Sequence, residues 1–313
     1  MIAKVVLLLV ALGFSWSMGA HYTGACMGMP YAAGSIKLRP ALTLMAAMTL
    51  FGATFFSHHV LIHVGHGIVL TPLRVYAAIS VIGIASLLTI LFTRLRIPTS
   101  TIQIMVFALI GTAIPLGLRV EWTAVLRLAI IWLLAPFVAC GLGFLFTKIL
   151  DLIPWMRSTD SVSHVGPALV TAGAIASVAM GANDVSNATA VFLSTRLSGP
   201  LMAGFIGGTG LALGAVTWGR PLLERVAFEV VRLDRIMATA AQLVQALVVL
   251  TAVIFGYFTS MNQALVGAMA GAGLARGRKT IESRTVFMIV QGWFIGPGAG
   301  FAVAYLVASV YLK

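Results

Sequence analysis

The sequence predicts an all-α membrane protein of about ten transmembrane segments, built as two inverted-topology repeats of five segments with broken helices where the repeats meet. Apolar residues make up 60% and charged residues 9% of the 313 positions, whereas a soluble domain carries about 25% charged residues. The apolar residues gather in ten separate segments, and landmarks of the first half return in the same order in the second. So little polar surface requires a lipid bilayer around most of the exterior.

Ten apolar segments divide the chain into lengths that suit membrane-spanning helices, each of which needs about 20 residues, with a range of roughly 17–25. They lie near residues 5–18, 41–57, 73–93, 102–118, 123–149, 165–182, 200–218, 236–258, 263–275 and 285–312. The first and the ninth are short for a full span. Short segments in corresponding halves of a membrane protein indicate broken helices around a binding site.

The basic residues are placed like membrane anchors, so the formal charge of +12 does not indicate nucleic-acid binding. They lie at the ends of apolar segments rather than in one patch. The side that bears the termini carries six of the 20 Lys and Arg residues, and the other side carries the remaining fourteen; the six are Lys4, Arg74, Arg119, Arg127, Arg196 and Lys313. Because positive residues stay on the cytoplasmic side, we predict a multi-pass plasma-membrane protein with both termini outside.

An internal repeat relates the two halves of the chain. Four landmarks recur at a nearly constant offset of 160 to 162 residues. Residues 17–26 match 179–188, and residues 50–53 match 212–215, both at an offset of 162. Residues 99–103 match 259–263 at an offset of 160, and Trp132 with Pro136 matches Trp293 with Pro297 at an offset of 161. Four matches in one order at one spacing indicate a duplicated unit rather than chance similarity.

The repeat defines the predicted domain organisation. We expect a first transmembrane repeat over residues 1–150, a short cytoplasmic linker over 151–164 and a second repeat over 165–313. Because each repeat holds five segments, the second enters the membrane from the opposite side, which is the architecture of many secondary transporters. In such folds the substrate site lies near the middle of the bilayer, where the halves meet. Residues at the repeat landmarks are therefore the site candidates.

The most polar stretch within an apolar segment spans residues 181–188 and contains Asn183, Asp184 and Asn187. Asp184 is the only acid that lies in apolar sequence rather than in a charged connector, and an unpaired charge in hydrocarbon costs roughly 2.5–3.5 kcal/mol or more. Their side chains offer hard oxygen ligands for a small cation, or donors and acceptors for an oxyanion, and Asn183 and Asn187 share one helical face. Of these alternatives we expect a coupling ion, Na⁺ or H⁺, at Asn183 and Asp184 and an anion at Asn187. The structural alternative is a helix cap, since Asn and Asp are favoured there.

Two repeat-related segments offer hydrogen-bond donors for an oxyanion. Their candidate anion-binding residues are Thr99, Ser100 and Thr101 in the first half, and Thr259, Ser260, Asn262 and Gln263 in the second. Hydroxyl groups and backbone N–H groups at the start of a broken helix suit a tetrahedral oxyanion. The alternative is that the hydroxyls bond back to helix carbonyls, which is common in membrane helices.

Histidine and cysteine residues give no further site by their spacing. His58, His59, His63 and His66 do not share one helical face and have no acid nearby, so we interpret them as residues of the outer membrane interface rather than as a metal site. Cys26 and Cys140 lie in apolar surroundings and are expected to pack. No cofactor is expected, and no metal beyond a coupling sodium ion.

Residues 181–188 resemble the Gly-Ala-Asn-Asp-Val-Ala-Asn-Ala signature of the inorganic phosphate transporter (PiT) family and differ from it only at Ser186. Residues 98–101 resemble that family's Pro-Ile-Ser-Thr-Thr-His motif, with Gln103 at the histidine position. The resemblance spans essentially the whole chain. It implies a secondary transporter of inorganic phosphate driven by sodium or protons, whose anion and cation sites are formed by Asn183, Asp184, Asn187, Ser100, Thr101 and Ser260.

The first copy of the signature departs from that family, which has the Asn-Asp pair in both halves. Here the equivalent positions are His21, Tyr22 and Thr23, a degenerate first-repeat site. This departure, with residues 27–34 after it, resembles the bacterial sulfate permeases of the same family. Phosphate near neutral pH can donate a proton to a carboxylate and sulfate cannot, so one remaining carboxylate is compatible with either anion. Loss of the first-half carboxylate predicts fewer coupling ions than in a family member that has both carboxylates.

Three other classes of protein compete with a transporter. A sensor or regulator would have lost transport through the degenerate first signature. A membrane enzyme has little support, because no nucleophile–base pair or metal-ligand spacing occurs among the polar residues of the apolar segments. A channel fits inverted halves less well than alternating access does. The small-residue stretch 267–273 suits internal packing or a homodimer face equally.

Overall fold

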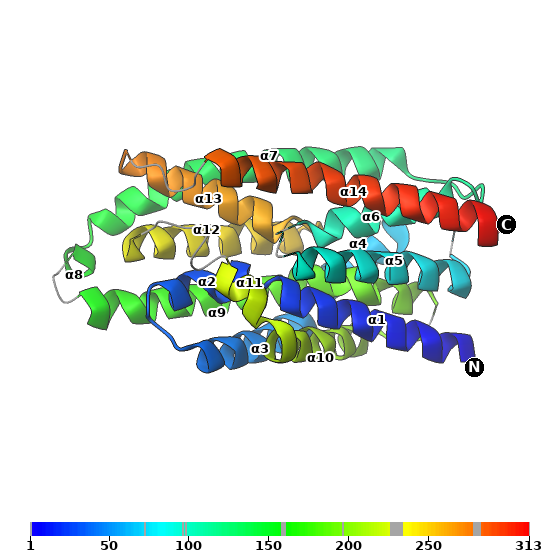
Figure 1. The fold of residues 1–313 in the computed structure, drawn as a ribbon, viewed down its shortest axis with the longest axis horizontal. Coiled ribbons are helices and arrows are strands. Elements are labelled where there is room, and N and C mark those ends of the chain that lie inside the picture. Colours follow the sequence, from blue (N-terminus) through cyan, green and yellow to red (C-terminus); the bar gives the residue numbers. More distant parts are fainter. Residues whose placement is uncertain are drawn as a thin grey trace.

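The computed structural model describes residues 2–71, 73–95, 97, 99–157, 161–195, 197–225, 234–277 and 283–312, and helices dominate these residues (Figure 1). The helices are α1 (Ile2–His21), α2 (Thr23–Ala32), α3 (Leu38–Phe55), α4 (His58–Gly67), α5 (Val75–Arg94), α6 (Thr101–Ala113), α7 (Trp122–Asp151), α8 (Pro154–Arg157), α9 (Ser161–Ser194), α10 (Pro200–Trp218), α11 (Arg220–Arg225), α12 (Arg235–Ile254), α13 (Met261–Ala275) and α14 (Ser283–Tyr311). An isolated antiparallel bridge joins Val69 and Val120.

Eight helical stretches of the described residues are long and apolar enough to cross a membrane. The all-α membrane class predicted from composition is therefore confirmed. Two of the ten apolar segments form the short helices α6 and α13, of 13 and 15 residues. The expectation that the first segment is short was wrong, because helix extends from Ile2 to Ala32 with one irregular residue at Tyr22. Hydropathy falls at His21, but the helix continues because the polar side chains there are bonded inside the protein.

Helix packing in the two halves follows the predicted correspondence. Within the first half α1 packs on α5, and within the second half α9 packs on α12 in the equivalent way. Between the halves, α3 packs on α9 and, equivalently, α10 packs on α1. The two short helices each pack on a long helix of the other half: α6 on α14, and α13 on α7. Figure 1 shows α6 and α13 starting near the middle of the long axis and running in opposite directions. This arrangement supports the inverted repeat, whose exact ten-span form stays a prediction.

Close backbone contacts at glycine hold α1 against α10. A Cβ atom on Gly19 would overlap the carbonyl of Leu211, and one on Gly214 would overlap the carbonyl of Trp16. The repeat-related pair Gly52 and Gly181 forms the same reciprocal contact between α3 and α9. Small residues at helix crossings allow this approach in membrane proteins, where van der Waals packing replaces the hydrophobic effect as the force between helices.

The polar signature lies in an unbroken helix. α9 continues from Ser161 to Ser194 through residues 181–188, so the signature residues are not helix caps. The irregularity falls in the first copy instead, where Tyr22 separates α1 from α2. Asn183 and Asp184 find partners on other segments, as described below, and so do not compete with the hydrogen bonds of their own helix.

Ion pairs fix the far end of α13. Arg276, which follows α13, pairs with Asp151 at the end of α7 and with Asp234 before α12. Asp234 also caps α12, since its Oδ1 accepts a hydrogen bond from the Met237 N–H at 3.0 Å. The short helix is therefore held at one end by charge and along its side by α7.

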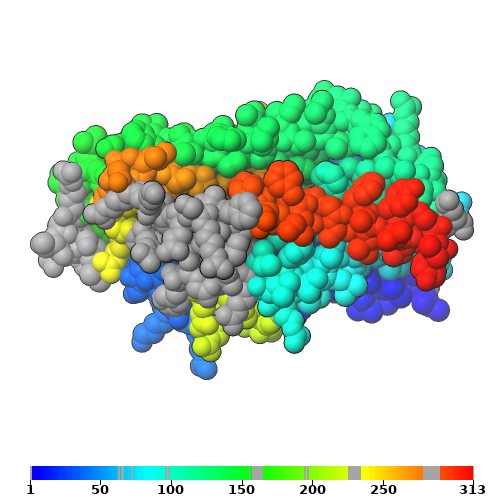
Figure 2. Space-filling model, turned by 45° about the horizontal axis from the view of Figure 1, so that its top comes forward, coloured from blue at the N-terminus to red at the C-terminus, as the bar shows by residue number. Residues whose placement is uncertain are grey.

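The exterior has the apolar character expected of a lipid-facing surface. α7 and α14 lie beside one another along one face (Figure 2), and Leu133, Phe137 and Leu306 on them are each at least 63% exposed. Both termini lie at one end of the long axis (Figure 1). This position is consistent with termini on one side of the membrane, and their outward orientation stays a prediction.

Gly214→Ala is expected to destabilise the protein, because the added methyl group meets backbone that cannot move aside. Overpacking of this kind costs about 1–3 kcal/mol. Thermal unfolding of the purified protein in detergent measures the loss. Gly298→Ala on α14 is the matched control, since nothing lies within 4 Å of its added Cβ, and an equal loss of stability in both variants would contradict the role of the contact.

Candidate functional site

Two short helices begin inside the protein and face a common polar centre. Ser100 caps α6, with its hydroxyl accepting from the Gln103 N–H at 3.4 Å, and Ser260 caps α13 by the same contact to Gln263 at 3.4 Å. Asn262 links the two starts directly, because its Nδ2 donates to the carbonyl of Thr99 at 2.7 Å. The structure thus brings together the two segments that the repeat predicted to be partners.

Asn183 holds the chain that leads into α13. Its Nδ2 donates to the Thr259 carbonyl at 2.9 Å, and its Oδ1 accepts from the Thr259 N–H at 3.0 Å. One side chain therefore satisfies both backbone groups of a buried residue just before the helix starts. The amide of Asn183 is engaged with the protein rather than directed only toward a ligand.

His21 holds the chain that leads into α6 in the corresponding way. Its Nδ1 lies 2.8 Å from the hydroxyl of Thr93, which itself donates to the Thr89 carbonyl at 2.7 Å. Nδ1 must then carry the proton, and Nε2 accepts from the Thr99 N–H at 3.2 Å. The first copy of the signature has changed residue type but keeps the bond to the backbone N–H before the short helix.

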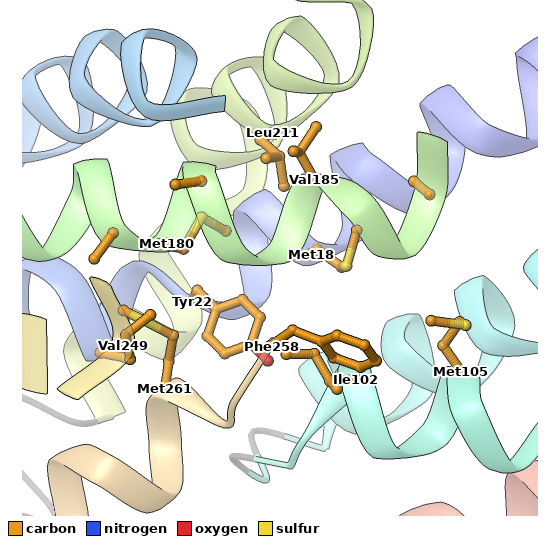
Figure 3. Packing of buried hydrophobic residues seen from close by; sticks show 14 of the residues in the cluster. Met18, Tyr22, Ile102, Met105, Met180, Val185, Leu211, Val249, Phe258 and Met261 are labelled. Atoms are coloured by element: carbon orange, nitrogen blue, oxygen red, sulfur yellow. The ribbon is translucent and has the colours of Figure 1, made fainter. Parts of the chain in front are cut away.

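Tyr22 occupies the position equivalent to Asp184 and reaches the same centre. Its hydroxyl lies 2.9 Å from the hydroxyl of Thr101, and the ring stands at right angles to that of His21 with centroids 5.4 Å apart. Figure 3 shows the Tyr22 ring between α9 and the starts of the short helices, with its oxygen pointing toward Phe258. A phenol therefore replaces the second carboxylate of a symmetric site.

Asp184 is fully buried and surrounded by protein donors. The amides of Asn183 and Asn187 donate to its two oxygens at 3.0 and 3.5 Å. A buried charge requires such donors to offset its loss of hydration. Asn183, Asp184 and Asn187 thus form one hydrogen-bonded group on α9.

Several buried polar atoms of this centre have no hydrogen-bond partner within the described residues. They are Thr99 Oγ1, Thr259 Oγ1, Gln103 Oε1, Gln263 Oε1 and Asn187 Oδ1. The first four form two repeat-related pairs. Buried polar groups are nearly always satisfied in proteins, so this set gives the centre the capacity to bind a small polar ligand.

One predicted residue lies outside this centre. The hydroxyl of Thr23 donates to the carbonyls of Ala20 and Gly219, at 3.1 and 2.5 Å. It therefore joins the start of α2 to the end of α10 and does not face the starts of α6 and α13. Its position next to Tyr22 in sequence does not place it in the site, because the chain turns there from α1 into α2.

Two site residues were missed from the sequence. Gln242 and Gln245 on α12 are buried, and the Nε2 of Gln242 donates to Gln245 Oε1 at 2.6 Å and to the Ala25 carbonyl at 2.8 Å. Gln245 in turn donates to the Met261 carbonyl at 3.3 Å at the start of α13. The available signal was a pair of amides, three residues apart, in an otherwise apolar segment.

The histidine cluster lies apart from the centre, on and beside α4. His58 and His59 are exposed, and their rings meet at 85° with centroids 5.5 Å apart. The side chains of His63 and His66 lie outside the described residues. Cys26 is buried and Cys140 partly buried, and both are free thiols.

A multi-pass helical membrane protein with two short helices that start at a buried polar centre has the build of a transporter. The chain belongs to the phosphate transporter family, whose family model matches residues 18–304. The resemblance found in residues 181–188 is thereby confirmed over nearly the whole chain.

Relatives of both substrate classes are similar to this chain. The sulfate permease CysP of Bacillus subtilis is 25% identical over 98% of this chain and 87% of its own length. A putative phosphate permease of Pyrococcus horikoshii is 24% identical over 98% and 97% of the two chains. A probable low-affinity inorganic phosphate transporter of Mycobacterium bovis is 26% identical over 98% and 77%.

The fold matches that of a solved structure described as the sodium-dependent phosphate transporter. The TM-score is 0.92 at 20% sequence identity, and 99% of each chain is covered. At this identity the match establishes the fold alone.

His21→Ala is expected to destabilise the start of α6, because the Thr99 N–H loses its acceptor, and a buried unsatisfied group costs about 1–3 kcal/mol. His21→Asn is the matched variant, since Asn183 shows that an amide performs this task on the equivalent residue. Thermal unfolding in detergent should rank the wild type and His21→Asn above His21→Ala. Equal losses in the two variants would show that the bond to Thr99 contributes nothing.

Proposed function

We propose that the protein is a secondary active transporter that moves an inorganic oxyanion, with phosphate the first candidate, together with Na⁺ or H⁺ by alternating access. The observation that carries this proposal is the meeting of two serine-capped helix starts beside one buried carboxylate. Membership of the phosphate transporter family supports it. The function is neither enzymatic nor directed at nucleic acid.

The anion is assigned to the starts of α6 and α13. The first N–H groups of a helix have no partner within the helix, and the helix dipole adds a partial positive charge there. The hydroxyls of Thr99 and Thr259 add donors from both halves, because each is buried and without a protein partner. Ser100, Ser260 and Thr101 bear further hydroxyls at the same place. Such a set suits the four oxygens of a tetrahedral anion.

The coupling ion is assigned to α9. Asp184 brings the negative charge, while the amide of Asn183 is taken up by Thr259. We therefore move Asn187 from the anion, to which the sequence assigned it, to the coupling ion, because its Nδ2 donates to Asp184 and its Oδ1, without a partner among the described residues, is a neutral oxygen suited to Na⁺. A proton on Asp184 is the alternative. We take sodium as the first candidate, by analogy with the structural neighbour described as sodium-dependent. With Tyr22 in place of a second carboxylate, one coupling cation is expected at this group.

Sulfate is the second candidate, and the surroundings of Asp184 favour it. A bare carboxylate facing the anion repels sulfate, which has no proton to donate. Here the amides of Asn183 and Asn187 already donate to Asp184. The anion therefore has no need to donate, and the sulfate permease among the relatives is consistent with this.

We place the transporter in the plasma membrane with both termini outside, because fourteen of the 20 Lys and Arg residues lie on the other side of the predicted spans. The bilayer covers the apolar exterior. Residues 267–273 suit either internal packing or a homodimer face by sequence. In the structure α13, which contains them, packs against α7 within the chain. Since that contact accounts for the small residues, it supports internal packing.

Asp184→Asn is expected to abolish uptake, because the coupling ion loses its only charged ligand. Ser100→Ala and Ser260→Ala should each weaken apparent anion affinity about 10- to 150-fold, since one lost hydrogen bond to a charged group corresponds to about 1.5–3 kcal/mol. The measurement is uptake of labelled phosphate and sulfate into proteoliposomes, with sodium and proton gradients imposed separately. Glu121→Gln, an acid outside the centre, is the control. Transport of neither anion by the wild type would refute the proposal and leave the sensor class.

Tyr22→Asp is expected to shift the preference between anions toward phosphate. It places a second carboxylate at the centre, which repels sulfate and can accept a proton from phosphate. Tyr22→Phe removes only the hydroxyl and separates loss of the donor from gain of charge. Competition between labelled sulfate and unlabelled phosphate measures the ratio, and an unchanged ratio in Tyr22→Asp would rule out a selective role for this position.

A further inference from the structure

We propose that the oxyanion passes between the site and the end of the molecule that carries both termini, along a route that opens beside Arg74 and narrows to an apolar neck against Asn187. The inference rests on the proposed transport function. It adds the side from which the anion enters and the residues that line the route. Only the inner end of the route includes signature residues, Ser186 and Asn187.

The inner part of the route is a cavity of about 70 Å³ between α4, α5, α6 and α9. Ser186 and Asn187 form part of its wall. Asn187 is only 4% exposed, and its Oδ1 is one of the buried atoms without a protein partner. The cavity therefore ends on a polar atom of the candidate site rather than on a purely apolar surface.

The remaining wall of this cavity is mostly apolar and forms the neck of the route. It includes Val64 on α4, Val81 on α5, Met105 and Leu109 on α6, and Ala190 on α9. A cavity needs about 10–15 Å³ of such volume to hold one water, so the neck admits water. It is much smaller than the outer cavity, and we place the barrier to a hydrated anion here.

The outer part is a cavity of about 770 Å³ at the end where α5 begins and α14 ends. Thr71, Arg74, Tyr76 and Tyr311 line it. Thr71 also lines the inner cavity, so the two cavities adjoin. The loop that carries Thr71 is fixed in place, because the Leu70 N–H donates to the Arg119 carbonyl at 3.0 Å.

The charge at the mouth of the route suits an anion. Arg74 is the one charged side chain among the described residues that line the two cavities. A positive group at the mouth of a cleft with low-dielectric walls raises the local concentration of anions. Arg119 lies at the same end, is exposed and lines neither cavity, and so provides a matched control.

Cysteine labelling tests the route without requiring transport. In a background with Cys26→Ala and Cys140→Ala, single cysteines are placed by Thr71→Cys at the rim, Ala190→Cys in the neck and Leu133→Cys on the lipid face. A C-terminal tag, detected by an impermeant antibody, identifies the side of the proteoliposome that bears the termini. The probe is an anionic, membrane-impermeant methanethiosulfonate applied to that side.

We expect the probe to modify Thr71→Cys and Ala190→Cys from the tagged side and to leave Leu133→Cys unmodified. Saturating phosphate or sulfate should slow modification at Ala190→Cys, because the anion and the probe compete for the same route. Failure to label Ala190→Cys from the tagged side, or labelling only from the other side, would overturn the route. Uptake that still depends on Asp184 would then leave the transport proposal standing.

Transport kinetics give an independent test with the native cysteines in place. Arg74→Gln should raise the KM for the anion at least about threefold at low ionic strength and leave kcat unchanged, and added salt should reduce the difference. Arg119→Gln should change KM less. Equal effects of the two substitutions would remove Arg74 from the route, whereas absence of uptake in the wild type would instead refute the transport function.

Discussion

The starts of α6 and α13 impose the constraint on which the rest of the structure depends. Each short helix begins deep in the protein, where no bulk water satisfies its free backbone groups or those of the residue before it. Asn183 bonds both backbone groups of Thr259, and His21 accepts from the N–H of Thr99. The serine caps at residues 100 and 260 complete the arrangement. A site made of helix starts is stable only because side chains of other helices hold the chain that enters them.

Those side chains reach the centre because the helices that carry them pack very closely. The reciprocal glycine contacts of α1 with α10, and of α3 with α9, leave no space for a Cβ atom. They hold the helices that carry His21 and Asn183 in position. Gln242 and Gln245 add a second set of bonds from α12 to the end of the first signature and the start of α13. Packing of small residues and buried amide bonds thus act on the same few segments.

The two halves perform the same structural task with different chemistry. An amide in one half and a neutral imidazole in the other bond the chain before a short helix, while a carboxylate and a phenol face the centre from equivalent positions. The backbone symmetry is therefore kept and the charge symmetry is lost. A centre with one negative charge and several hydroxyl donors suits an anion that brings its own charge and a single coupling cation, which is why this asymmetry bears on both substrate and coupling.

The sequence by itself determined the membrane class and located the ten apolar segments, the repeated landmarks and the candidate site residues, because hydropathy and polar residues in apolar runs are local properties. It could not show where the helices break. α9 runs unbroken through the signature and the first segment reaches Ala32, since the polar side chains there bond to segments 70 to 80 residues away. Nor could it show that His21 bonds the chain before α6 as Asn183 bonds the chain before α13, that Thr23 faces α10, or that Gln242 and Gln245 join the centre. Only the tertiary structure decided these points, because each depends on which distant backbone group a side chain meets.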